Sequence, residues 1–130
     1  MNCKKLITRS LILLFVFSIL SCDDDEGAPA ANKRNVRFEV TGNFSGTMDA
    51  TFITESGGGT NEMVTSLPWT KEINYAATVP SMSILVGGYD GVGGQSITLK
   101  VFAGGKLVSS TPGTANSNGI VAITSPPYVF

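Results

Sequence analysis

The chain offers few side chains for covalent or acid–base chemistry, because its 130 residues include no histidine and two cysteines, Cys3 and Cys22. Without an imidazole, Ser-His-Asp triads and Cys-His dyads are excluded, as are metal sites that depend on histidine. Apart from the two cysteines, the chemistry that remains open is that of a carboxylate pair, a Ser-Lys dyad or an oxygen-only cation site.

Cys22 stands at the end of a pattern typical of an export signal. Three basic residues precede an apolar run over residues 11–20, and the small Ser21 comes directly before the cysteine. A positive start, an apolar core of about ten residues and a small residue at the cleavage point are the parts of a secretory signal. The apolar run is shorter than the roughly 20 residues of a membrane-spanning helix.

Residues 19–22, Ile-Leu-Ser-Cys, resemble the bacterial lipobox, in which the peptide is cut before the cysteine and that cysteine carries acyl chains. We therefore predict a signal peptide over residues 1–21 and lipidation, palmitate included, at Cys22. The alternative is an ordinary cleaved signal followed by a chance cysteine. If Cys3 leaves with the signal and Cys22 carries lipid, no thiol remains for a disulfide or a metal.

The acidic residues beyond the signal do not form a catalytic pattern. Glu39, Asp49 and Glu72 alternate with apolar residues, as solvated strand faces do, while Glu55 and Glu62 flank a loop. Two of them on neighbouring strands would reach glycosidase-like distances, but no feature of the sequence would raise a carboxyl pKa for that role. We predict that the protein is not an enzyme and that it has no catalytic residue, metal site or cofactor.

Residues 22–34 read as a disordered tether, because acidic residues and then a Gly-Ala-Pro-Ala-Ala-Asn stretch show no apolar periodicity. Asp23, Asp24, Asp25 and Glu26 resemble the surface-export signal of Bacteroidota lipoproteins. The alternatives are a solvated spacer or, in other envelopes, an inner-membrane retention mark. We predict an outer-membrane lipoprotein of the cell envelope that is exposed at the cell surface.

The charge of the mature chain limits its partners. Without residues 1–21 the chain has six Lys or Arg and ten Asp or Glu, a net charge of −4. A nucleic-acid partner is excluded, because phosphate neutralisation needs a clustered basic face. The same charge argues against electrostatic binding to anionic lipid, so membrane attachment is expected through the acyl chains on Cys22.

Residues 35–130 alternate with period two, the pattern of strands with one buried and one wet face. The alternating runs fall at residues 36–41, 47–52, 72–75, 82–86, 97–101, 106–110 and 120–124. Turn signals separate them at residues 42–46, 56–61, 87–94, 104–105 and 112–119. About seven short antiparallel strands over roughly 100 residues predict an all-β sandwich.

Three segments resemble the MmpS-like domain in order and spacing: residues 36–42 (Val-Arg-Phe-Glu-Val-Thr-Gly), Leu67-Pro68-Trp69, and residues 96–102 running into Gly105-Lys106. The resemblance implies an immunoglobulin-like β-sandwich and a role beside RND-type exporters of lipids or siderophores. This chain departs from the mycobacterial members, which have a protein anchor and commonly carry cysteines.

Two aromatic residues have alternative interpretations. Trp69 is expected to pack between the sheets, with Leu67 and Pro68 as structural neighbours, although aromatic residues are also enriched in binding hot spots. Tyr89 lies in a glycine-rich segment, residues 87–94, that lacks the spacing and the lysine of a phosphate-binding loop. We expect this segment to be a flexible connection that places Tyr89 against a partner.

The sequence leaves three functional hypotheses. The first is a lipid-anchored, non-catalytic binding or accessory protein that contacts an envelope protein or an apolar ligand. The second is an accessory of an RND-type transporter. The third is a structural surface protein, such as an adhesin or assembly subunit, that pairs through exposed strand edges.

Overall fold

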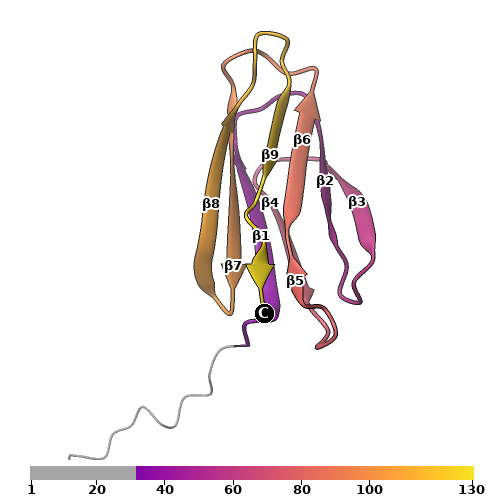
Figure 1. Ribbon diagram of the computed structural model, residues 1–130. Coiled ribbons are helices and arrows are strands. Elements are labelled where there is room, and N and C mark those ends of the chain that lie inside the picture. Colours follow the sequence, from indigo (N-terminus) through magenta and orange to yellow (C-terminus); the bar gives the residue numbers. More distant parts are fainter. Residues whose placement is uncertain (1–31) are drawn as a thin grey trace, which may run out of the picture. The chain divides into compact units, whose positions relative to one another are not determined.

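The fold is an all-β sandwich, shown by a computed structural model that describes residues 32–130 (Figure 1). The first sheet has the order β4 (Trp69–Asn74), β1 (Asn35–Gly42), β7 (Ser96–Ala103) and β8 (Lys106–Thr114). The second sheet has the order β3 (Gly59–Val64), β2 (Thr47–Ile53), β6 (Ile84–Tyr89) and β9 (Val121–Thr124). A short ribbon pairs β5 (Ser81–Met82) with β10 (Tyr128–Val129). All pairs are antiparallel, so the predicted β-sandwich is confirmed.

The core lies between the two sheets and is built from the alternation seen in the sequence. On β1, Val36, Phe38 and Val40 are fully buried, and the residues between them face outward. Phe38 meets Phe52 of the second sheet with ring centroids 5.8 Å apart. Burial of these side chains from both sheets is the main stabilising contribution, because each large apolar side chain removed from water is worth about 1.5–3 kcal/mol.

The structure has more strands than the seven that the sequence predicts. β3 begins in a segment that the sequence predicts to be a turn. The strand is not visible in the sequence because two of its three inward positions, Thr60 and Glu62, are polar, and only Val64 is apolar. Pairing with β2 supplies the backbone hydrogen bonds that hold β3 in the sheet. β8 continues through Pro112, also expected in a turn. Proline is tolerated there because β8 is an edge strand and needs no donor on its free side.

The predicted tether overlaps the folded domain by a few residues. Arg34 Nη1 donates hydrogen bonds to the carbonyl oxygens of Ala76 (2.6 Å) and Val79 (2.9 Å). The Arg34 guanidinium lies 4.6 Å from the centroid of the Phe130 ring. Residues 32–34 therefore belong to the base of the sandwich, where they bring the start of the described chain against its last residue. In the part of the chain that the structure covers, no helix is long and apolar enough to cross a membrane.

Tyr75, which lies in this base, should make the folded domain less stable at alkaline pH. Its hydroxyl donates to the Ile53 carbonyl oxygen (2.7 Å), and burial raises the pKa of the phenol to about 12. The folded state therefore keeps the proton that the unfolded state loses above pH 10. Stability from Tyr75 is present below pH 10 and is lost as pH rises toward 12, by up to about 2–3 kcal/mol.

Chemical denaturation of the wild type and Tyr75→Phe at pH 8 and pH 11.5 measures this effect. We expect the advantage of the wild type over the variant, about 1 kcal/mol at pH 8 from the hydrogen bond, to shrink or reverse at the higher pH. An advantage that does not change with pH would contradict the prediction.

Candidate functional site

Four large apolar side chains point outward from the second sheet. This set, here called the apolar face, consists of Met63 on β3 (58% exposed), Leu85 and Tyr89 on β6 (42% and 50%) and Ile120 before β9 (47%). Each stands next to a buried residue in the chain, so the alternation of the strands turns all four to the same side of the sheet. Tyr89, predicted as a contact residue, is thus one member of a larger exposed surface.

The apolar face has little charge around it. Among the outward positions on the four strands of the second sheet, Asp49 is the single charged residue. Its neighbour on β6 is Gly87, which in turn pairs with Ala122 on β9. An added methyl group at Gly87 would meet nothing within 4 Å. Because Gly87 has no side chain and Ala122 a small one, the surface of the sheet is recessed between Leu85 and Tyr89.

The outer face of the first sheet has the opposite character. Arg37 pairs in register with Glu72, and Glu39 pairs with Lys100. The Arg37 guanidinium lies 4.3 Å from the Phe102 ring centroid and 3.9 Å from Glu39 Oε2. One side of the sandwich is therefore a solvated charged surface, although β8 also exposes Leu107 and Val108 there. The other side carries one charge, and its exposed apolar residues lie among Thr47, Thr51, Asn61 and Thr124.

Three connections at the end of the sandwich remote from residue 32 are joined by hydrogen bonds (Figure 1). They cover residues 43–46, 90–95 and 115–120. Gln95 Oε1 accepts from the backbone N–H of Ser45 (3.1 Å) and of Val92 (3.0 Å). The N–H of Gly91 donates to the Gly119 carbonyl oxygen (3.0 Å), which ties the second connection to the third.

The glycine-rich segment around Tyr89 is therefore not the flexible connection that the sequence predicts. Gly87, Gly88 and Tyr89 belong to β6, and the remainder is tied to its neighbours. Its glycines serve packing. A methyl group at Gly88 would lie 2.6 Å from Phe44 Cε1, so the buried ring of Phe44 occupies the space that a side chain would need. Phe44 lies in a segment that the sequence predicts to be a turn, and its place in the core has no signal in the local pattern.

The adjacent glycines of β6 give a matched test of this packing. Gly88→Ala should lower the free energy of unfolding by about 1–3 kcal/mol, because the new methyl group overlaps Phe44 and Met48. Gly87→Ala should be neutral or stabilising by less than about 1 kcal/mol, because its site is open and alanine restricts the unfolded chain. Chemical denaturation measures both, and equal effects at the two positions would contradict this account.

Trp69 and its neighbours lie at one edge of the sandwich. Trp69 begins β4 and, like Leu67, is partly buried and packs against the core, while Pro68 is exposed. The Trp69 ring centroid lies 6.4 Å from that of Phe52. The expected packing role of Trp69 is therefore seen, but its full burial is not, because β4 is an edge strand with no further strand to cover it.

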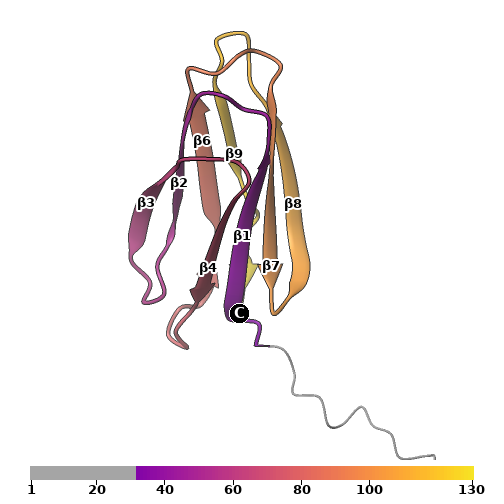
Figure 2. The ribbon, with the colours of Figure 1, turned by 180° about the vertical axis from the view of Figure 1, so that it is seen from behind.

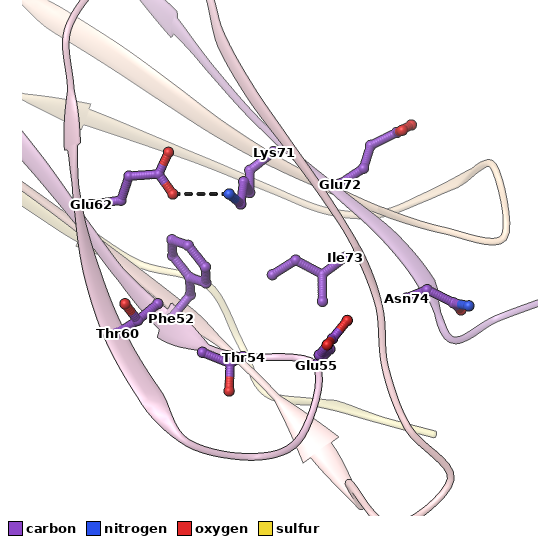
Figure 3. Close-up of a pocket in the computed structure, with 9 residues that line it drawn as sticks. All are labelled: Phe52, Thr54, Glu55, Thr60, Glu62, Lys71, Glu72, Ile73 and Asn74. Atoms are coloured by element: carbon purple, nitrogen blue, oxygen red, sulfur yellow. Dashed lines mark ion pairs between the residues drawn. The ribbon is translucent and has the colours of Figure 1, made fainter.

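The candidate acids separate into different surfaces. Glu39 lies on the outer face of the first sheet and Asp49 on that of the second, so the sandwich holds them apart. Glu55, Glu62 and Glu72 border a pocket at the edge between β3 and β4 (Figure 3). Within residues 32–130, no three acidic side chains gather in a geometry that would hold a metal ion.

Cys22 and the acidic run at Asp23, Asp24, Asp25 and Glu26 lie outside the described residues, so their roles stay predictions. Of the exposed surface, the sequence pointed to Tyr89 alone. The sequence also contains a signal for Met63, Leu85 and Ile120, because each is a large apolar residue on the solvent-facing side of its strand. Comparison of the chain with protein-family models and with curated proteins finds no match in either case.

Proposed function

We propose that this protein is a lipid-anchored, non-catalytic binding or accessory protein of the cell envelope, and that it contacts a protein partner through the apolar face. The observation that carries the proposal is the exposure of Met63, Leu85, Tyr89 and Ile120 on one nearly uncharged side of a sandwich whose other side is charged. Exposed apolar patches of this kind mark interaction sites in soluble domains.

The order of the surrounding connections supports the same proposal. Tyr89 and Ile120 adjoin connections that hydrogen bonds hold in place. A preordered surface binds with a smaller loss of conformational entropy than a mobile one. The resemblance to MmpS-like domains makes an RND-type transporter the first partner to test.

The alternative of a structural subunit that pairs through strand edges has less support. β8 is the longest described strand and pairs through hydrogen bonds with β7 alone, but Pro112 removes one of its N–H groups. The register of β7 and β8 also shifts between Val101 and Phe102. Prolines and bulges at edges are features that hinder strand addition.

Site-specific photo-crosslinking in intact cells tests the proposed contact. A photoreactive residue at Leu85 or Tyr89 should crosslink to a specific envelope protein, while the same residue at Lys100, on the charged face, should not. Crosslinking from Lys100 alone, or from none of the three positions, would reject the apolar face as the contact surface.

The position of the domain is tested with protease added to intact cells. We expect the wild-type domain to be digested, and a variant with Asp23, Asp24, Asp25 and Glu26 changed to Asn and Gln to be protected, because the acidic run follows the lipidated cysteine. Digestion of both after lysis is the control. Protection of the wild type in intact cells would show that the domain faces the periplasm.

A further inference from the structure

The two edges of the sandwich differ. At one edge β8 and β9 lie against each other, whereas at the other β3 and β4 diverge (Figure 2). The gap between β3 and β4 contains a pocket of about 400 Å³. That volume lies within the roughly 300–1,000 Å³ of small-molecule sites.

The pocket is open to solvent, with a small apolar floor and two polar ends. Phe52 from β2 and Ile73 from β4, which are 4% and 8% exposed, form this small floor (Figure 3). At one end, Lys71 Nζ lies 3.1 Å from Glu62 Oε2, an ion pair that joins the edges of the two sheets. Glu55 stands at the other end, beyond Ile73.

The charges of the pocket do not balance. Lys71 is neutralised by Glu62, whereas Glu55 makes no ion pair with another residue of 32–130. Glu72 and Asn74 contribute to the rim but point away from the middle (Figure 3). The pocket therefore combines one unpaired carboxylate with a small apolar floor, while the hydroxyl groups of Thr54 and Thr60 point away from its middle (Figure 3).

From this arrangement we infer that the pocket between β3 and β4 binds an organic cation, an amine with an apolar arm. The ammonium group pairs with Glu55, and the arm packs on Phe52 and Ile73. An anion of the same shape is repelled by Glu55, and a neutral analogue gains the apolar contact alone. This site is separate from the apolar face and does not depend on the proposed function.

Three probes with the same phenylethyl arm test the inference: 2-phenylethylammonium, 2-phenylethanol and phenylacetate. The protein is the chain of residues 22–130 with Cys22→Ser, which retains the whole compact unit Ala31–Phe130. Amide chemical shifts are followed by NMR at pH 7 and low salt. We expect saturable shifts at the pocket residues with a Kd on the order of 1 mM for the amine, binding several-fold weaker for the alcohol, and none for the carboxylate.

Two substitutions should change amine binding in opposite directions. Glu55→Gln should weaken it by about two- to fivefold, the range of a partly exposed ion pair. Lys71→Met should strengthen it, because it removes a like charge and frees Glu62. Glu39→Gln, on the outer face of the first sheet, is the control and should have no effect.

Several outcomes would overturn the inference. They are equal shifts from all three probes, no saturable shift up to about 20 mM amine, shifts confined to the apolar face, and amine binding unchanged by Glu55→Gln. Because Glu55 is exposed, its replacement should leave the fold intact, and the dispersion of the amide spectrum reports this directly.

Discussion

Cys22→Ser is expected to abolish membrane attachment. The change removes the thiol that we propose accepts acyl chains, and without residues 1–21 the net charge of −4 provides no electrostatic substitute on an anionic membrane. Two or three acyl chains hold a protein stably on a membrane, whereas a protein without acyl chains stays in solution. The variant should therefore carry no acyl label, and any protein released from its signal peptide should appear in the soluble fraction.

Metabolic labelling with a palmitate analogue and fractionation of membranes measure this result. Ser21→Ala is the matched control, because it keeps a small residue before the cysteine and should leave labelling unchanged. An unlabelled, soluble mature protein from the wild-type gene would refute lipidation at Cys22.

Phe38→Ala should have the largest effect on folding. Phe38 is fully buried on the central strand β1 and packs against Phe52 across the core, 5.8 Å between ring centroids. Deletion of a core phenylalanine costs about 3–5 kcal/mol. That is a large part of the 5–15 kcal/mol that stabilises a domain of this size, so the variant should melt more than about 10 °C lower.

Leu85→Ala is the matched control for this change. It removes a large apolar side chain from the apolar face, where water already reaches it, and should cost less than about 1 kcal/mol. Calorimetry of the two variants separates a core residue from a contact residue. If Leu85→Ala were as destabilising as Phe38→Ala, the exposed position of Leu85 would be wrong.

The sequence predicts the sandwich because the core strands alternate without interruption. Val36, Phe38 and Val40 on β1, like Ile97, Leu99 and Val101 on β7, are apolar at each second position and buried. β3 was missed because an edge strand above an open pocket can place Thr60 and Glu62 on its inner side. Pairing with β2 decided its structure, and pairing partners cannot be read from local pattern.

Of the residues in the candidate site, the sequence alone predicts one, Tyr89. Tyr89 was found because it interrupts a glycine run, but its association with Met63 and Ile120 depends on the order β3-β2-β6-β9, which brings distant segments onto one face. The pocket depends on the divergence of two edge strands and has no local signal at all. Phe44 was missed because its neighbours are turn residues, although Gly88 makes room for its ring.

The position of β1 has a consequence for the timing of folding. The first strand of the domain lies in the middle of its sheet, between β4 and β7, and Arg34 beside it contacts Phe130 at the end of the chain. Sheets built from such distant pairs fold in milliseconds to seconds rather than microseconds. In a chain emerging residue by residue, β1 therefore cannot be paired on both sides until β7 has been made. This delay keeps the chain unfolded for longer, which agrees with the export that we propose for it.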